Sequence, residues 1–314
     1  MSDAGAPALA AVDWGTSSLR VWLLDAGGAV LAERRSGEGM QTARETGFSA
    51  VLERLLADLG APAGLPAIVC GMAGARQGWV EAPYADVPCT LTEIFDRAVP
   101  VENAGRVVRI VPGLAQRDRA SPDVIRGEET QIAGAVGGLG AGRHILCMPG
   151  THSKWVEVEE SRVLGFATWM TGELFNVLST HSILAHSIGE AAKEAAAEKE
   201  AFRDGLSLGL EQADRLTSLL FGIRAGTLLH GLRPAAAAAR LSGLLMGAEI
   251  AGAKRRYLGA GGSVALVASG VLADLYRDAL TLAGLGVGTV DADEAVRAGL
   301  VRAARVNGFL PGSS

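Results

Sequence analysis

Short apolar runs that alternate with turn residues fill the first 36 residues of the chain. The runs Leu9–Asp13, Leu19–Leu24 and Ala29–Glu33 each predict a strand. Turns rich in glycine, serine and threonine at 15–18 and in glycine at 26–28 separate these runs. The pattern therefore predicts a β-meander at the start of the chain.

A second meander is predicted near the middle of the chain. The first turn of each meander carries the same chemistry, because Gly-Thr-x-Ser occurs at 15–18 and again at 150–153. Two such matches at the same place in two meanders indicate the internal duplication of an α/β unit. The strands of the second meander are predicted at His144–Met148, Lys154–Val158 and Val163–Thr168.

Helical periodicity and short apolar runs predict the remaining elements. A helix at 48–59 stops before Gly60, which is a plausible C-terminal cap. The segment 178–254 is rich in alanine and predicts a set of helices. Further predictions are a strand at 67–70, a helix at 126–136, a strand at 264–268, a turn at Ser269-Gly270, and helices at 271–283 and 292–306.

Length and charge limit the classes of protein to which this chain can belong. The 314 residues, 49% of them hydrophobic, are enough for two domains with sizeable cores. A net charge of −5 argues against a nucleic-acid partner, which usually meets a basic surface. The N-terminus lacks the basic region of a signal peptide, and no uncharged apolar run reaches the ~18 residues of a membrane span. We expect a cytoplasmic protein with no membrane partner.

Common cofactor and metal motifs are missing from the sequence. No lysine follows a glycine, so the phosphate-loop pattern GxxxxGK[ST] is absent. The glycine clusters at 138–142 and 284–288 fall short of a dinucleotide fingerprint. Cys70, Cys89 and Cys147 are far apart, which favours buried hydrophobic roles over a zinc site or a disulfide framework.

The two Gly-Thr-x-Ser turns remain as candidate chemistry. Such a turn exposes consecutive backbone N–H groups and adds hydroxyl donors, which together suit anionic phosphate oxygens. Asp13 stands at the end of the strand before the first turn, where its carboxylate can hold Mg²⁺ for phosphoryl transfer. The alternative for Asp13 is a residue that only initiates the turn.

Six stretches together resemble the 2-dehydro-3-deoxygalactonokinase family, within the actin-like ATPase and sugar kinase superfamily. They are DWGTSSLR, GMAGARQGWVEAPY, RGEETQ, LCMPGTHSKW, TWMTGELF and LVASGVLADLY. The resemblance implies an α/β fold of two ribonuclease-H-like lobes at 1–142 and 143–314, with a helical insertion at about 178–254 in the second lobe. It also implies that ATP and a sugar acid bind in the cleft, and that the γ-phosphoryl group of MgATP is transferred to the 6-hydroxyl of 2-dehydro-3-deoxy-D-galactonate.

The same resemblance assigns residues to the nucleotide. Asp13 would hold the metal, the first phosphate hairpin would follow it, and the second would lie in the second lobe. Ser269 and Gly270 would start the turn that binds adenosine. The hairpin residues are Gly15, Thr16, Ser17 and Ser18 in the first, and Gly150, Thr151, His152 and Ser153 in the second.

The acceptor site is expected in two of the matching stretches. Arg76 could pair bidentately with the substrate carboxylate, and Trp79 could pack against the carbon chain. A surface salt bridge is the competing interpretation of Arg76, and Arg20 is a rival for the carboxylate. The other candidates for acceptor binding are Met72, Thr171 and Glu173.

A general base is expected at the start of a helix before the second hairpin. Sugar kinases of this superfamily often carry Gly-Asp there, and this chain has Gly127-Glu128. Glutamate therefore stands where aspartate is usual, and Asp123 and Glu129 are the alternatives. Two other functions stay open on the same fold: a kinase for another hexose or amino sugar, and a non-metabolic actin-like ATPase. The helical insertion fits a cleft wall or a homodimer surface better than a filament contact.

Overall fold

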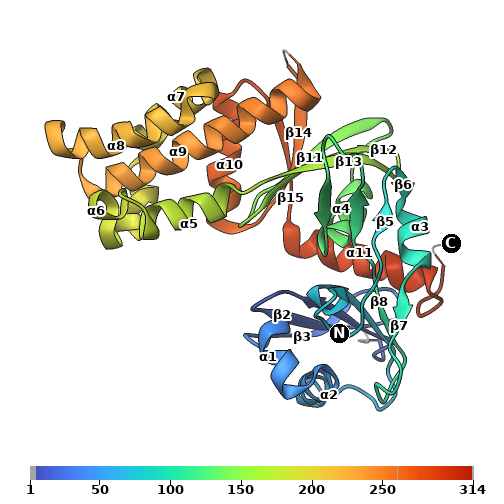
Figure 1. Ribbon diagram of the computed structural model, residues 1–314. Helices are drawn as coiled ribbons and strands as arrows, with labels where there is room; N and C mark the ends of the chain where they lie inside the picture. The colour runs from blue at the N-terminus through green and yellow to red at the C-terminus, as the bar shows by residue number, and fades with distance from the viewer. Residues whose placement is uncertain (1–4, 260, 313–314) are drawn as a thin grey trace. The chain divides into compact units, whose positions relative to one another are not determined.

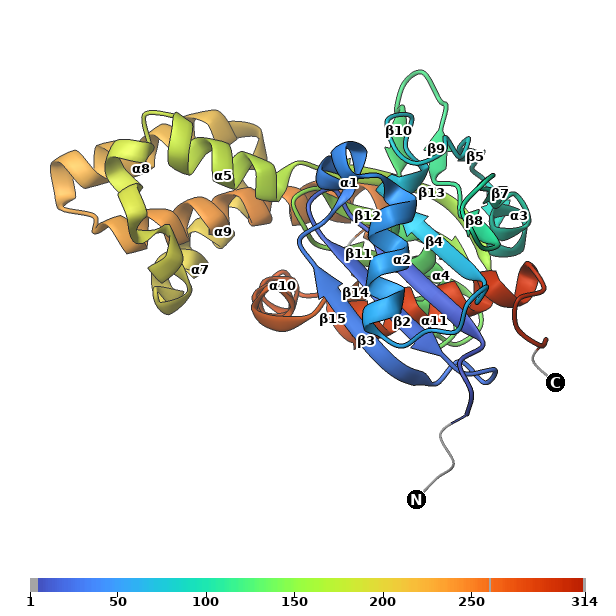
Figure 2. The same cartoon turned by 90° about the horizontal axis from the view of Figure 1, so that it is seen from below.

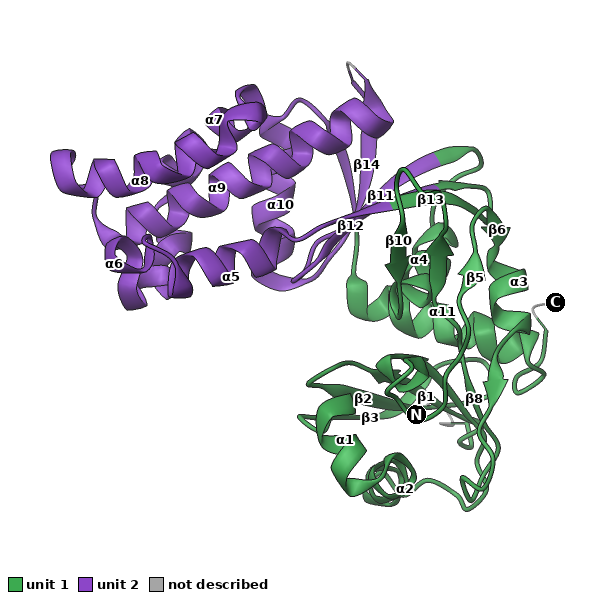
Figure 3. Ribbon diagram, viewed as in Figure 1, with its two compact units in different colours: residues 1–143, 158–166, 290–314 green, residues 144–157, 167–289 purple. Residues whose placement is uncertain are grey.

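The computed structural model describes residues 5–259 and 261–312 of the chain. Its contacts divide into two compact units (Figure 3). Unit 1 contains the residues up to 143, the segment Val158–Phe166 and the residues from 290 onward. Unit 2 contains His144–Glu157 and Ala167–Thr289.

A six-stranded sheet forms the centre of unit 1, and it begins with the predicted meander. β1 pairs antiparallel with β2, and β2 with β3, while β1 lies parallel to β4. The strand order is β3-β2-β1-β4-β8-β7. The strands are β1 (Leu9–Trp14), β2 (Leu19–Leu24), β3 (Val30–Ser36), β4 (Ala67–Gly71), β7 (Val99–Pro100) and β8 (Val108–Ile110).

Helices cover both faces of this sheet (Figure 2). α1 (Met40–Thr46) and α2 (Phe48–Asp58) pack on one face, where α2 buries residues at helical spacing against alternate residues of β1. α11 (Ala292–Val306) contacts β1 and β4 and packs along α4 (Glu128–Val136). Successive residues of a strand point to opposite faces of the sheet, and here each face is covered by helices. β1 is therefore apolar along most of its length.

The last helix belongs to unit 1, whereas the predicted second lobe extended from 143 to the C-terminus. Two glycines allow this packing. A Cβ at Gly134 of α4 would overlap the backbone of Ala295, and a Cβ at Gly299 of α11 would overlap the backbone of Thr130. The two helices therefore approach closely, and α11 closes the core of the unit that the N-terminal strands begin.

Short elements follow β4 in unit 1. A three-stranded sheet has the order β10-β9-β5, and residues 72–82 form a compact loop after β4. The sequence did not predict these strands, which are too short to show a period. The elements are η1 (Met72–Gly74), β5 (Ala85–Asp86), β6 (Cys89–Thr90), α3 (Leu91–Asp96), β9 (Leu114–Gln116) and β10 (Asp123–Ile125).

The second predicted meander is confirmed, and it belongs to a sheet of order β15-β14-β11-β12-β13-β6. β11 lies parallel to β14, which leads into α10 (Gly270–Leu282). The glycine cluster at 284–288 mostly forms a strand. The strands are β11 (Arg143–Met148), β12 (Ser153–Glu159), β13 (Arg162–Trp169), β14 (Ser263–Val267) and β15 (Gly286–Val290).

Helices fill unit 2 from residue 171 to 258, with α9 at their centre (Figure 1). α9 carries only two charged residues, Arg240 and Glu249, and is buried around most of its surface. Glycines at 205, 209, 243 and 247 let α7 and α9 meet backbone to backbone. The elements are α5 (Thr171–His181), α6 (Ala185–Ile188), η2 (Gly189–Ala197), α7 (Lys199–Glu211), η3 (Ala213–Arg215), α8 (Leu216–His230), α9 (Pro234–Ala253) and η4 (Lys254–Leu258).

Although several of these helices are apolar, no helix among the described residues combines the length and hydropathy needed to cross a membrane.

Candidate active site

Asp13 lies near the end of β1, half-buried between two strands. It stands opposite Arg20 on β2 and beside Cys70 on β4. Removal from water raises the pKa of Asp13, the Arg20 guanidinium opposes this rise, and the negative charge of Glu128 adds to it. The strand end that the sequence singled out thus holds a carboxylate with an opposite and a like charge in its surroundings.

The first hairpin is exposed at its tip, and α1 supports its base. Thr16, Ser17 and Ser18 are exposed, and the N–H of Gly15 donates to the carbonyl of Ser18 at 2.8 Å. The N–H of Met40 at the start of α1 donates to the carbonyl of Gly15. The hydroxyls of the tip are therefore accessible while the base of the turn is fixed.

Two adjacent glutamates begin α4. Gly127 has φ 103°, a conformation that favours glycine, and it abuts Gly71 at the end of β4. The N–H of Arg126 donates to the Glu128 carboxylate at 2.9 Å, and the N–H of Gly127 donates to Glu129 at 2.6 Å. Gly71 pairs with Trp14 across β4 and β1, so the start of α4, which abuts Gly71, lies close to the end of β1 in unit 1.

The two glutamates differ in how deeply they are buried. Glu128 is half-buried, whereas Glu129 is fully buried, and one of its carboxylate oxygens has no hydrogen-bond partner. Burial raises the pKa of Glu129 to about 8, and the nearby Glu128 charge adds to the rise. Glu129 therefore holds a proton at neutral pH and cannot accept one from a substrate. Asp123, the other alternative, lies on β10, where its carboxylate accepts the N–H of Val124.

The protonation of Glu129 predicts how stability depends on pH. Between pH about 4.5 and 8, the folded protein keeps a proton at Glu129 that the unfolded chain has released. The free energy of unfolding contributed by this group should therefore fall as pH rises through that interval, by up to about 1.4 kcal/mol per pH unit. Urea unfolding of Glu129→Gln should show a flatter dependence on pH than the wild type. Equal slopes for the two proteins would contradict a protonated Glu129.

The predicted acceptor residues in unit 1 differ in their surroundings. Arg76 is exposed, and no hydrogen bond or ion pair joins it to another described residue. Trp79 stacks on Phe48 with ring centroids 5.9 Å apart and contacts Trp14, so most of its ring packs in the core. Met72 is half-buried at the start of the loop.

Two further arginines of unit 1 are engaged with protein groups. Arg20 forms an ion pair with Asp293 at the start of α11. Arg126, which the sequence analysis did not select, lies 4.4 Å from the centre of the Tyr84 ring and donates to the carbonyl of Ala82. Arg126 thereby joins the start of α4 to the segment that follows Trp79.

In unit 2, the start of α5 packs directly against the second hairpin. Gly172 lies against Gly150 and Thr151, where a Cβ would meet backbone, and the N–H of Glu173 donates to the carbonyl of Thr151 at 2.9 Å. The side chain of Glu173 pairs with His152. Glu173, expected at the acceptor, is thus a neighbour of the hairpin.

Ser153 differs from the rest of its hairpin. Thr151 and His152 are exposed, whereas Ser153 is fully buried and its hydroxyl donates to Glu249 at 2.6 Å. The expectation that Ser153 offers its hydroxyl to a phosphate therefore needs correction, because that donor is used inside the protein. The exposed residues of the turn are Thr151 and His152, and Gly150 is half-buried.

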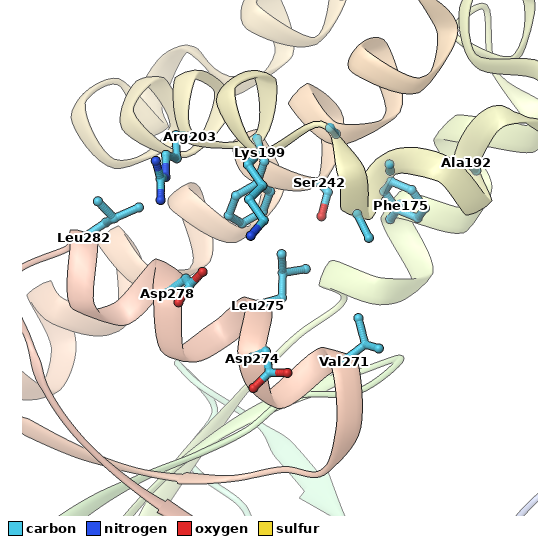
Figure 4. Close-up of a pocket in the computed structure, with 14 residues that line it drawn as sticks. Phe175, Ala192, Lys199, Arg203, Ser242, Val271, Asp274, Leu275, Asp278 and Leu282 are labelled. Carbon is cyan, nitrogen blue, oxygen red and sulfur yellow. The ribbon is translucent and has the colours of Figure 1, made fainter.

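A cavity of about 340 Å³ lies beside α10 (Figure 4). Lys199 extends into it from α7, opposite Asp274 and Asp278 on α10, and Phe175 and Leu275 form apolar walls. A second cavity of about 140 Å³ shares Phe175, Ser242 and Leu275 with the first, and it is also lined by Gly150, Thr171 and Tyr276. Together, the linings of the two cavities extend from α10 to Gly150 of the second hairpin. Ser269 precedes this helix and Gly270 begins it, and both residues are exposed.

Comparisons with known proteins agree on one family. A family model described as 2-keto-3-deoxy-galactonokinase matches residues 13–303. A protein of Rhizobium meliloti (strain 1021) named "Probable 2-dehydro-3-deoxygalactonokinase DgoK1" is 58% identical over 299 residues, which are 94% of this chain and 96% of the relative. The 2-dehydro-3-deoxygalactonokinase of Escherichia coli (strain K12) is 35% identical over 290 residues, covering 92% of this chain and 95% of the relative.

Solved structures agree with the fold. A crystal structure from Sinorhizobium meliloti, assigned to the same kind of kinase, has a TM-score of 0.89 at 56% identity and covers 95% of this chain and 98% of its own. Component A of the (R)-2-hydroxyglutaryl-CoA dehydratase of Acidaminococcus fermentans has a TM-score of 0.52 at 13% identity, with coverage of 95% and 98%. The second likeness concerns the fold alone.

Proposed function

Because the chain belongs to the 2-keto-3-deoxy-galactonokinase family, we propose that it is a cytoplasmic kinase that phosphorylates 2-dehydro-3-deoxy-D-galactonate at its 6-hydroxyl. The observation that carries the proposal is the match along residues 13–303, which includes Asp13, Glu128 and both hairpins. The proximity of the end of β1, which carries Asp13, to the start of α4 supports it, since phosphoryl transfer needs a metal-binding carboxylate and a base at one site.

The nucleotide fits the features of unit 2. The cavity beside α10 has apolar walls for a flat base and a few polar groups for the ribose, and its size is that of a small-molecule site. The phosphates would meet the backbone N–H groups and the Thr151 hydroxyl of the second hairpin. The small cavity at Gly150 and Thr171 lies between these two regions.

The donor set near Asp13 suits Mg²⁺. The described part of the chain contains no group of three His, Cys, Asp or Glu side chains that could hold a metal alone. Mg²⁺ at a kinase site typically takes one or two carboxylates and completes its shell with water and substrate phosphates. A single strand-end carboxylate such as Asp13 fits this mode, and the bound ion would neutralise charge that develops on the phosphoryl group.

Glu128 is the base in this mechanism. Its half-buried carboxylate stands at the start of α4, where it accepts the N–H of Arg126. It accepts the proton of the acceptor hydroxyl as the hydroxyl oxygen attacks the phosphoryl group. Glu129 cannot replace it at neutral pH, because burial keeps Glu129 protonated.

Arg76→Met should weaken binding of the sugar acid while leaving the affinity for ATP unchanged. The guanidinium is exposed and unengaged in the described structure, so a substrate carboxylate meets no competing partner there. Loss of a hydrogen bond to a charged group predicts weaker binding by about 1.5–3 kcal/mol, roughly ten- to hundredfold. Calorimetric titration with the sugar acid would measure the change. An unchanged affinity in this variant, with a loss in Arg20→Met, would assign the carboxylate to Arg20.

Substrate-dependent ADP formation tests the proposed function. Purified protein with MgATP is assayed against sugar acids, hexoses and amino sugars. Turnover that requires 2-dehydro-3-deoxy-D-galactonate is expected, with the product phosphorylated at the 6-hydroxyl. Turnover with a hexose or amino sugar alone would overturn the choice of acceptor. ATP hydrolysis that needs no acceptor and follows ATP-dependent assembly would identify an actin-like ATPase instead.

A further inference from the structure

Glu249 on α9 is only 1% exposed, and its side chain accepts four hydrogen bonds from other protein groups. One carboxylate oxygen accepts from the Ser153 hydroxyl at 2.6 Å and from the Trp155 indole N–H at 2.8 Å. The other accepts from the Tyr276 hydroxyl at 2.8 Å and from the Thr171 hydroxyl. Burial raises the pKa of Glu249, and the hydrogen bonds act against this rise. None of these donors carries a charge, so hydrogen bonds to neutral groups satisfy both oxygens of the buried side chain.

The four donors come from segments that surround the candidate nucleotide site. Ser153 ends the second hairpin, and Trp155 follows it on β12. Thr171 begins α5, the helix whose first turn packs on that hairpin. Tyr276 lies on α10, two turns after the exposed Ser269-Gly270 turn. A single side chain on α9 therefore connects the phosphate hairpin, the start of α5 and the helix beside the larger cavity.

We propose that Glu249 is a positioning residue for the nucleotide, which fixes the second hairpin and α10 at the spacing that ATP requires. The inference rests on the proposed kinase function and adds a residue that touches neither substrate. If a segment moved away, its donor would be left unpaired inside the protein, which costs more than the bond itself is worth. Glu249 therefore makes departures from the ATP-binding arrangement unfavourable.

The chemistry of the four donors distinguishes two substitutions. In Glu249→Gln, the amide oxygen can accept from Trp155 and Ser153, while the amide nitrogen can donate to the hydroxyls of Thr171 and Tyr276. Hydroxyls can accept as well as donate, so glutamine can keep all four connections. Leucine is of similar size and can keep none. Glu249→Gln is thus the conservative rescue, and Glu249→Leu removes the connections.

The test measures three quantities in each variant: the affinity for MgATP without acceptor, the KM of the sugar acid and the melting temperature. Glu249→Leu should bind MgATP about 10- to 100-fold more weakly, the usual effect of losing a residue that orients a binding group. The KM of the sugar acid should stay near the wild-type value. Glu249→Gln should recover most of the affinity for ATP.

Single-donor variants keep the test decisive if Glu249→Leu does not fold. Ser153→Ala and Tyr276→Phe each remove one connection, from the hairpin and from α10 respectively, and each should weaken MgATP binding about fivefold. Ser179→Ala is the matched control. Its hydroxyl is similarly buried on α5 but donates to a carbonyl of the same helix, so the affinity for ATP should not change.

Wild-type affinity for MgATP in a folded Glu249→Leu, or equal behaviour of Ser153→Ala, Tyr276→Phe and Ser179→Ala, would overturn the inference. So would an equal loss of affinity for ATP and for the sugar acid, because that result indicates general damage. A wild-type protein that binds MgATP but phosphorylates no sugar acid would overturn the proposed function instead. The ATP measurements would still decide the role of Glu249.

Discussion

Glu128→Gln should lower kcat by about 10²–10⁴-fold, the range for loss of a general base. Glutamine keeps the size of the side chain and can still accept the N–H of Arg126, so the start of α4 should remain in place. It cannot take the proton of the acceptor hydroxyl at neutral pH. Single-turnover phosphorylation measures the loss, and calorimetry should show ATP and acceptor affinities close to those of the wild type.

Two neighbouring carboxylates provide the controls for Glu128. Glu129→Gln replaces a buried acid that is already protonated, so its effect on kcat should be much smaller. Asp123→Asn changes a residue of the three-stranded sheet and should also leave most of the turnover. A selective loss of kcat in either control, with Glu128→Gln active, would assign the base to that residue and leave the kinase function intact.

Asp13→Asn should lower turnover by about a hundredfold or more, since a metal-bound carboxylate supports several kcal/mol of transition-state stabilisation. The fold should persist, because asparagine can still accept the weak hydrogen bond of the Cys70 thiol, which lies 3.7 Å from the Asp13 carboxylate. The measurement is kcat/KM over a titration of Mg²⁺, with circular dichroism as the check on folding.

The surroundings of Asp13 should also make the affinity for Mg²⁺ depend on pH. Because its pKa is raised, Mg²⁺ must displace a proton over part of the acidic range, and the apparent affinity for Mg²⁺ should fall as pH decreases. Asp13→Asn should abolish this dependence. Wild-type rates at every Mg²⁺ concentration in the variant would show that Asp13 only initiates the turn.

The sequence alone determined the helices and strands whose hydrophobic residues recur at a regular spacing. Both meanders, the helix from Phe48 and the helix Ala292–Val306 follow from alternation or helical spacing, because these patterns depend on neighbours a few residues apart. The strand end at Asp13 and the hydroxyls of the first hairpin were also readable, since their position relative to a strand and a turn is local. The family followed from six longer stretches.

The tertiary structure decided the roles that depend on environment. Glu128 and Glu129 are adjacent acids on one helix, and only packing shows that one remains accessible while the other is buried and protonated. Ser153 belongs to a hydroxyl-rich turn, yet its hydroxyl points inward to an acid 96 positions further along. Residue type fixes what a side chain can donate or accept, but the partner is set by distant segments that only folding brings together.

Dependence on distant segments also explains why the sequence did not predict the hydrogen bonds of Glu249 or the packing partner of the last helix. In the sequence, Glu249 is a single charge that interrupts an apolar helix, and nothing local indicates four donors from three other segments. The pattern of Ala292–Val306 predicts a helix but not its partner, which depends on Gly134 and Gly299 meeting the backbone of the opposite helix. Local periodicity thus determined which segments are helices and strands, whereas close packing between distant segments determined which carboxylates are accessible, which are protonated and which connect several segments.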